Sequence, residues 1–243
     1  MSKFIACNSE IKEVHYNGYT ISKIYACGGQ LVYSGETPPI PTDKKLYMVD
    51  NTGGTYTLEC DGRNLIEHTM KNFEYNDGVS SQTIVFLSNQ QKRSIVSAVI
   101  GTCVTGVEGS VFSGFTSLSS VTIPNTVINM CGDGDVFRGC TSLEYINIPD
   151  SVDCIGGHSF QDCSNLKGVN IGSGITEISN YAFSGCVNME YITIKATTPP
   201  DILFNTFNDS NNCPIYVPQD SVEIYKTENT YWEHYAPRIQ GIT

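Results

Sequence analysis

The stretch VFRGCTSLEYINIP, residues 136–149, decides the fold, because its pattern Phe-x-x-Cys-x-x-Leu-x-x-Ile-x-Ile recurs along the second half of the chain. The phenylalanines of four such segments, Phe112, Phe137, Phe160 and Phe183, lie 25, 23 and 23 residues apart. A fixed period of roughly 20–29 residues is typical of solenoids, in which stacked coils bury a continuous core. The repeats therefore predict a scaffold that presents a surface and seldom houses a catalytic pocket.

Composition narrows the classes of partner. The chain has 243 residues, of which 40% are hydrophobic, and this is enough to bury a core. Its net charge of −11 repels a phosphate backbone, so we predict no nucleic-acid partner. No apolar run approaches the ~20 residues of a membrane span. The first residues also lack the apolar segment of a secretory signal, so we expect a soluble chain that is not exported by that route.

The ten cysteines follow the repeat and do not suggest a disulfide framework. Cys140, Cys163 and Cys186 each follow a repeat phenylalanine by three residues, and Phe115 fills that place in the first repeat. Phenylalanine can replace cysteine only where burial is the requirement, and free cysteine packs as a small hydrophobe. No Cys-x-x-Cys pair or Cys/His cluster has zinc spacing. We therefore expect structural burial in preference to redox or metal use, with no cofactor.

The first 94 residues fall into three parts. Residues 1–36 contain three alternating runs joined by turns, including Asn17-Gly18, and predict a small β-meander that needs a partner to complete it. Residues 37–43, TPPIPTD, carry three prolines and predict a linker. Residues 44–94 predict an N-terminal cap of the repeats, with a hairpin that turns at 51–54, a helix over 64–73 and a strand over 84–87.

The remaining chain contains the repeats and their closing unit. The repeats extend over residues 95–207, and the insertion CGDGD at 131–135 lengthens one of them. Residues 208–243 predict a C-terminal cap, with a strand at 215–217, a helix near 220–227 and the chain's single tryptophan, Trp232. A large aromatic residue suits the end of a stack, where core would otherwise be exposed.

The segments FRGCTSLEYINIPDSVDCIG from Phe137 and FSGCVNMEYITI from Phe183 resemble BspA-type leucine-rich repeats, and the tail CPIYVPQDSVEIYKT resembles the usual ending of such arrays. The resemblance covers roughly residues 95–207. It implies a mainly β protein: a short leucine-rich repeat solenoid with capping units, preceded here by the small β-meander module. It also implies a surface adhesin or modular binding protein, and none of the family's motif residues is catalytic.

The opening EIKEVHYNGYTISKIYACGGQLVY, from Glu10, is similar to N-terminal modules on structural proteins of tailed phages that infect gut bacteria. This resemblance implies a virion protein assembled in the host cytoplasm. Its N-terminal module would dock on other virion proteins or self-associate into a homo-oligomer, and the acidic repeats would face outward toward a host-surface protein or glycan. The alternative is a bacterial adhesin located at the cell surface.

Candidate binding residues come from the outward positions of Leu-x-x-Ile-x-Ile, because alternate side chains of a strand point to opposite faces. Tyr145 and Tyr191 would lie roughly 10 Å apart, two strands from each other, with Gly168 leaving a gap between them. Two aromatic rings beside an open floor suit a sugar or a peptide strand. The alternative is that tyrosine simply has a high β propensity. The predicted surface comprises Glu144, Tyr145, Asn147, Lys167, Asn170, Glu190 and Tyr191.

Catalytic and metal sites find little support in the sequence. Asp133 and Asp135 resemble the start of a calcium loop, but the later ligands are missing, so we predict a solvated turn. No Gly-x-Ser-x-Gly elbow occurs. The four histidines are dispersed at His15, His68, His158 and His234. No nucleophile, base and oxyanion donor share a neighbourhood, so we predict a protein that is not an enzyme and has no catalytic residues.

Overall fold

A computed structural model describes residues 12–16, 19–27, 30–33, 44–59, 64–66, 73–76, 81–84, 87–203 and 205–242. The chain divides into two compact units, Met1–Ile40 and Pro41–Thr243. The division falls within the segment 37–43 that we predict to be a linker, although that segment itself lies outside the described residues.

The first unit is a three-stranded antiparallel meander. Its strands are β1 (Lys12–Tyr16), β2 (Tyr19–Cys27) and β3 (Gln30–Tyr33), and they are ordered β1-β2-β3. The predicted meander is confirmed. The predicted turn at residues 17–18 lies outside the described residues.

The second unit opens with the predicted hairpin of β4 (Lys44–Asp50) and β5 (Thr55–Glu59), which pair antiparallel. The buried Asp50 carboxylate shapes the turn, because it accepts hydrogen bonds from the backbone N–H groups of Thr52 and Gly54, both at 2.9 Å. Aspartate commonly orders a turn in this way.

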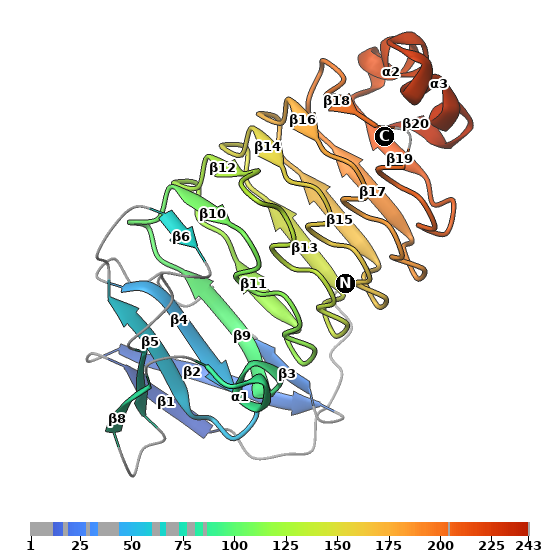
Figure 1. The fold of residues 1–243 in the computed structure, drawn as a ribbon. Helices are drawn as coiled ribbons and strands as arrows, with labels where there is room; N and C mark the ends of the chain where they lie inside the picture. The colour runs from blue at the N-terminus through green and yellow to red at the C-terminus, as the bar shows by residue number, and fades with distance from the viewer. Residues whose placement is uncertain are drawn as a thin grey trace. The chain divides into compact units, whose positions relative to one another are not determined.

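This hairpin extends the sheet of the first repeats (Figure 1). Strand β4 pairs antiparallel with β9 (Ile95–Ile100), and β9 pairs parallel with β11 (Ser120–Thr122). Beyond β5 the sheet continues through β7 (Phe73–Asn76) and β8 (Ser81–Ile84). The short helix α1 (Asn89–Ser94) precedes β9, and a capping box between Ser88 and Gln91 fixes its start. The first repeat strand is thus covered on one side by antiparallel strands.

The predicted helix over residues 64–73 is wrong. Asn64–Ile66 form strand β6, and Phe73 begins β7, while residues 67–72 lie outside the described part. Strand β6 pairs parallel with β10 (Gly106–Glu108), and this pairing buries Leu65 completely. Apolar spacing alone cannot separate a short buried strand from a helix turn. Of the strand predicted over 84–87, Ile84 is the last residue of β8 (Ser81–Ile84), Leu87 is not in a strand, and residues 85–86 lie outside the described part.

The repeat coils build two parallel sheets (Figure 1). The long-strand sheet is ordered β13 (Tyr145–Ile148), β15 (Gly168–Ile171), β17 (Tyr191–Ile194), β19 (Ile215–Val217) and β20 (Ile239–Gly241). The short-strand sheet begins with β6 and β10. It continues through β12 (Asn129–Met130), β14 (Cys154–Ile155), β16 (Glu177–Ile178) and β18 (Asp201–Ile202). The predicted mainly β solenoid is confirmed.

A row of phenylalanines stacks through the core between the two sheets. The rings of Phe112, Phe137, Phe160 and Phe183 stack in sequence at centroid distances of 5.1, 5.2 and 5.1 Å, and Phe207 follows Phe183 at 5.8 Å. Such aromatic pairs contribute about 0.5–1.5 kcal/mol each beyond their burial. The 23-residue period is therefore the spacing that places one ring on the next.

The repeat cysteines lie beside this row as free, buried thiols, as we predict for them. Each thiol also donates to the carbonyl oxygen of a phenylalanine on the preceding coil: Cys140 to Phe112 and Cys163 to Phe137, both at 3.1 Å. Cys186 repeats this contact with Phe160. Burial raises the pKa of the Cys163 thiol to about 12. These thiols are therefore neutral core groups that link adjacent coils.

The C-terminal end closes the stack with α2 (Val222–Thr227) and α3 (Thr230–Tyr235), flanked by the 3-10 turns η2 (Gln219–Ser221) and η3 (Ala236–Arg238). The predicted strand at 215–217 and the helix near 220–227 are confirmed. Trp232 is fully buried, and its indole N–H donates to the Pro200 carbonyl oxygen at 2.8 Å. In the described part of the chain, no helix has the length and apolar character needed to cross a bilayer.

Candidate ligand-binding surface

The predicted surface residues within the strands share one face of the long-strand sheet, and Glu144, Lys167 and Glu190 directly precede those strands. Strand register pairs Tyr145 with Gly168 and Gly168 with Tyr191, and it pairs Asn147 with Asn170. Burial alternates along β13, where the side chains between the outward positions are buried. Because the strands are parallel and in register, equivalent positions of successive repeats form straight columns across this face. We call these outward columns the tyrosine face.

The open floor that we expect between the two tyrosines is absent. The Tyr191 ring lies over Gly168, in the space that a side chain at position 168 would occupy, and Gly168 is buried as a result. The expectation fails because a tyrosine beside a glycine can lean over the neighbouring strand, and the distance between strands does not show which rotamer the tyrosine adopts. The space above Gly168 is therefore filled by an aromatic ring.

Tyr145 stands on the strand beyond Gly168, in the same column, and its side chain is 52% exposed. Strands in a sheet lie about 4.8 Å apart, so the ring over Gly168 lies on the strand next to Tyr145. Tyr191 itself is half-buried. The two tyrosines therefore place two aromatic rings on the same face, each with a polar hydroxyl group. Such rings offer large apolar area together with a hydrogen-bonding group.

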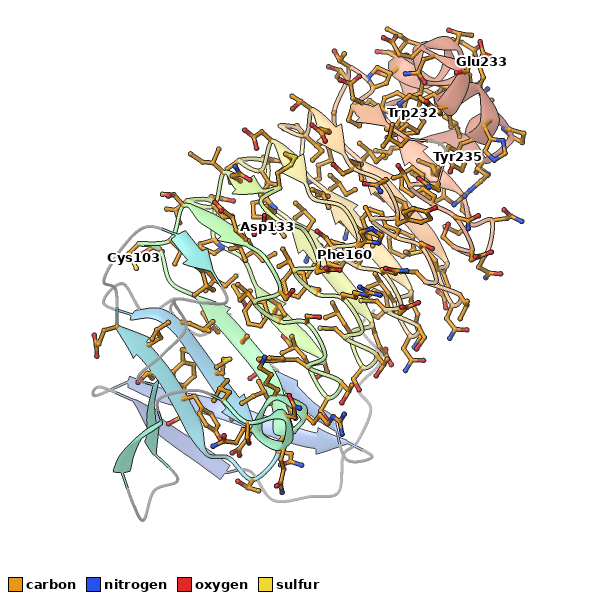
Figure 2. The ribbon with its side chains drawn as sticks, in the orientation of Figure 1. Cys103, Asp133, Phe160, Trp232, Glu233 and Tyr235 are labelled. Atoms are coloured by element: carbon orange, nitrogen blue, oxygen red, sulfur yellow. A yellow bond between two sulfur atoms is a disulfide. The ribbon has the colours of Figure 1, made fainter. Side chains whose placement is uncertain are left out.

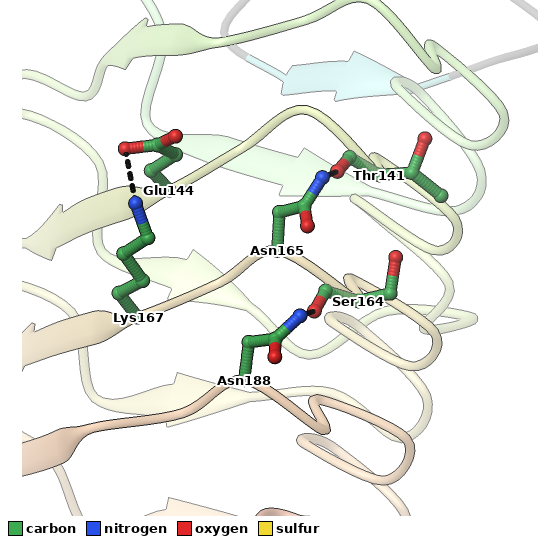
Figure 3. Close-up of polar contacts among 6 residues, drawn as sticks. All are labelled: Thr141, Glu144, Ser164, Asn165, Lys167 and Asn188. Carbon is green, nitrogen blue, oxygen red and sulfur yellow. Dashed lines mark hydrogen bonds and ion pairs between the residues drawn. The ribbon is translucent and has the colours of Figure 1, made fainter.

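A charged column flanks the tyrosines. The Lys167 ammonium donates to a Glu144 carboxylate oxygen at 3.0 Å (Figure 3). The hydrogen bond that Lys167 donates to Glu144 raises the pKa of the Lys167 ammonium, and the charge of Glu190 adds to the shift. The pair is open to solvent, so water screens it and its contribution to stability is small. The pair holds the Lys167 ammonium against the Glu144 carboxylate beside the tyrosines.

An amide column flanks the tyrosines on the other side. The Asn170 side-chain N–H donates to the Asn147 side-chain oxygen at 2.7 Å, and both amides reach solvent. Each amide has two donors and one two-fold acceptor, so this single bond leaves further capacity for a ligand. The face therefore combines aromatic, amide and charged groups within three strands.

The structure extends the surface to residues that the sequence analysis did not name. Tyr216 continues the amide column on β19, opposite Thr193, and Gln240 follows it on β20. The signal in the sequence is the Ile-Tyr-Val triplet at 215–217, which matches Ile-x-Ile 23 residues after Ile192. We missed these positions because they lie in the cap, beyond the last full repeat.

Asparagines of the adjoining turns have a structural role. The side-chain N–H groups of Asn165 and Asn188 donate to the carbonyl oxygens of Thr141 and Ser164 on the preceding coil, each at 2.7 Å (Figure 3). The two contacts are equivalent and lie 23 residues apart. They satisfy backbone groups between coils and hold the turns beside the tyrosine face in register.

The turn candidates do not form a site with the surface. Asp133 lies exposed on the turn after β12 (Figure 2), and the Asp135 carboxylate pairs with Arg138 at 3.4 Å. His158 contacts Gln161 at 2.8 Å and stacks on Tyr181. These interactions are local to one turn or link neighbouring turns of the coil.

Three cysteines differ from our expectation that the cysteines follow the repeat and form no disulfide framework. Cys131 and Cys154 form a disulfide between adjacent coils, with 5.4 Å between their Cα atoms, and Cys103 is also disulfide-bonded. Sequence reasoning missed the pair because it searched for short zinc spacings. The available signal is their separation of 23 residues, one repeat period, which places them on neighbouring coils.

A separate cavity of about 600 Å³ lies at the C-terminal end, beside the buried Tyr235 (Figure 2), and is lined by Phe207, Asn208, Asp209, Asn212, His234, Tyr235, Pro237 and Arg238. The Arg238 guanidinium donates to the carbonyl oxygen of Cys213 at 2.8 Å and to the Ser210 hydroxyl at 3.1 Å. It also lies over the Phe207 ring. The guanidinium therefore helps to close the end of the phenylalanine row.

These features define a leucine-rich repeat solenoid whose outward sheet face carries aromatic, amide and charged side chains. A family model described as the BspA type leucine rich repeat region (6 copies) matches residues 85–213, which is more than half of the chain. The chain belongs to this family. Proteins built of leucine-rich repeats are generally non-catalytic binding scaffolds.

The chain is also similar to a solved structure, a leucine-rich repeat protein from Bacteroides ovatus. The two share 18% sequence identity with a TM-score of 0.33, over 64% of this chain and 47% of that one. The match thus covers about half the length of the Bacteroides protein. No curated protein matches the chain.

Proposed function

We propose that this chain is a non-catalytic recognition protein that binds an external protein or glycan on its tyrosine face. The observation that carries the proposal is the ring of Tyr191 held over Gly168, beside the half-exposed Tyr145. A ring that is already positioned loses little conformational freedom on binding, and preorganisation of this kind favours affinity. The amides of Asn147 and Asn170 add donors and acceptors next to the rings.

Two ligand classes fit this chemistry. A sugar ring can stack its C–H face on a tyrosine and bond its hydroxyl groups to amides. An extended peptide can lie along the columns, where its side chains meet the Glu144–Lys167 pair. The negative charge of the whole chain, −11, disfavours strongly anionic ligands.

The test compares the intact chain with the double variant Tyr145→Ala/Tyr191→Ala on an array of oligosaccharides and in selection from a peptide display library. We expect the intact chain to retain a ligand that the double variant loses, because aromatic anchors dominate such surfaces. The matched control is Tyr231→Ala, since Tyr231 is 38% exposed on α3, away from the face. Equal binding by all three chains would refute the proposal that the ligand binds on the tyrosine face.

For the location of the protein, we propose attachment to a phage particle, with the meander of residues 1–36 docking on other virion proteins. A three-stranded sheet is stable only when one of its faces is packed, so pairing with a second chain would complete it. Deletion of residues 1–36 should abolish incorporation into particles and leave the repeats folded. Normal incorporation of the truncated chain would contradict this role.

The second candidate is an adhesin at a bacterial cell surface, and the Cys131–Cys154 disulfide favours it. Disulfides persist in oxidising surroundings and are rare in the cytosol. Mass spectrometry of the protein taken from its native source, with free thiols blocked at lysis, separates the two. A cell-surface fraction that carries the disulfide supports the adhesin, whereas particles that carry free thiols support the virion protein.

A further inference from the structure

Among the described residues, one group of three side chains can together hold a metal ion: Cys131, Cys154 and Glu177. Their donor atoms all lie within 4.8 Å of one another. We propose that these residues form a redox-gated cation site, in which the reduced pair of thiols and the carboxylate bind Zn²⁺. This inference does not depend on the tyrosine face, which belongs to the other sheet.

The fold positions the three groups on neighbouring coils. Cys154 in β14 and Glu177 in β16 are in register on adjacent parallel strands, and Cys131 directly follows β12 on the other side of β14. Strand spacing of about 4.8 Å is thus what brings a thiol, a second thiol and a carboxylate together. No loop has to close to assemble them.

The donor set fits a thiophilic divalent cation. Zinc is bound by cysteine sulfur at about 2.3 Å and by carboxylate oxygen at about 2.0–2.2 Å, usually with four ligands. The three protein groups leave one position for water. The Ser179 hydroxyl donates to a Glu177 carboxylate oxygen at 2.6 Å, and such second contacts orient a ligand.

Access distinguishes this group from the other thiols. Cys131 is partly exposed, Cys154 is 9% exposed and Glu177 is exposed, so an ion and a reductant can both reach the site. The free cysteines Cys140, Cys163, Cys186 and Cys213 are buried in the core. The site therefore combines three donor groups with access from solvent.

The gating step is a balanced two-electron reduction. A dithiol reductant gives two electrons and two protons to the Cys131–Cys154 disulfide, which becomes two thiols, and the reductant closes to its own disulfide. Zn²⁺ then displaces the two thiol protons and bonds to both sulfurs. The covalent link between the coils is exchanged for a metal link, so the same two coils stay joined in either state.

The test uses Co²⁺ as a spectroscopic probe for the zinc site, on the full chain. The protein is reduced with a water-soluble phosphine, which takes an oxygen from water to become its oxide, and is then titrated with Co²⁺. We expect a thiolate-to-cobalt charge-transfer band that saturates at one equivalent, disappears on adding Zn²⁺ and is absent from the oxidised protein. The oxidised protein requires no mutation, so misfolding cannot imitate this result.

Three variants complete the experiment. Cys131→Ser/Cys154→Ser should lose the one-equivalent band, and any absorbance that remains measures the contribution of the other thiols. Glu177→Gln should weaken zinc binding at least about tenfold, because even indirect partners of a metal ligand contribute that much. Glu233→Gln, at an exposed position on α3, is the matched control and should bind zinc as the unmodified chain does. An unchanged band in the double serine variant, or none in the reduced protein, would overturn the proposal.

Discussion

Gly168 and Tyr191 face each other in register on β15 and β17, and the tyrosine ring occupies the place of the missing side chain. The glycine and the tyrosine are therefore one structural unit: the absence of a Cβ in one strand sets the position of a ring that belongs to the next. Surface aromatic residues positioned in this way need no rearrangement before they contact a ligand.

Gly168→Ala tests this relationship without removing an aromatic group. The new methyl would collide with the end of the Tyr191 side chain, which is flexible enough to swing away. We expect the free energy of unfolding to change by less than about 1 kcal/mol, because alanine costs less backbone entropy than glycine. Binding at the tyrosine face should nevertheless weaken. Denaturant unfolding and the ligand assay measure the two effects separately, and unaltered binding would show that the position of the ring is unimportant.

The repeat thiols should resist modification in the folded protein. Cys140, Cys163 and Cys186 are fully buried, and burial raises the pKa of each thiol. Alkylation followed by mass spectrometry should label them only after denaturation. Cys163→Ser should lower the free energy of unfolding by about 1–3 kcal/mol, since it places a hydroxyl in an apolar site. Rapid labelling of all three in the native protein would contradict this account of the core.

Alkaline pH should destabilise the repeat domain. The pKa of the Cys163 thiol is raised from 9.0 to about 12 by burial, so above pH ~9 the unfolded chain loses protons that the folded chain retains. Stability is therefore fully present below pH ~9 and falls as the pH approaches 12, by up to about 1.4 kcal/mol per pH unit for each such thiol. Urea unfolding between pH 8 and 11 measures the slope. In Cys163→Ala, the free energy of unfolding should fall less steeply with pH, because one titrating thiol is missing. An identical pH dependence would contradict the raised pKa of the Cys163 thiol.

Trp232 should stabilise the protein by covering the C-terminal end of the core. Its ring contacts Phe207 at 6.2 Å and Tyr225 at 4.9 Å between centroids. Trp232→Ala should lower the free energy of unfolding by about 3–5 kcal/mol, as expected for removal of a buried aromatic residue. Because Trp232 is the single tryptophan, its emission should shift to longer wavelength as this end unfolds. Tyr231→Ala, on the exposed side of α3, is the control and should have little effect on stability.

Much of the fold follows from the period of the repeat. The 23-residue spacing of Phe137, Phe160 and Phe183 predicts stacked coils, and alternation within each strand predicts which residues face outward. Both the strand at 215–217 and the helix near 220–227 agree with the structure because their residues continue or close the same core. Where sequence alone failed, at residues 64–73, a few apolar positions fitted two kinds of element equally well.

The candidate surface is less predictable than the fold. Spacing places Tyr145, Gly168 and Tyr191 in one column, but the rotamer that lays Tyr191 over Gly168 depends on contacts between strands. The Cys131–Cys154 pair joins two coils, and its separation of 23 residues is too long for a search for short metal-binding motifs to find. Sequence reasoning thus finds the positions on the surface, whereas contacts across neighbouring strands decide their geometry.

The most direct test of ligand binding on the tyrosine face is a comparison of affinities by titration calorimetry. The ligand is the strongest glycan or peptide selected with the intact chain. The proteins compared are the intact chain, Tyr145→Ala/Tyr191→Ala and Tyr231→Ala. The account predicts that the intact chain and Tyr231→Ala bind with equal affinity. The double variant should bind at least about tenfold more weakly, a loss of about 1.4 kcal/mol or more, with unchanged circular dichroism. Equal affinities for all three chains would show that the ligand binds elsewhere and would contradict the account.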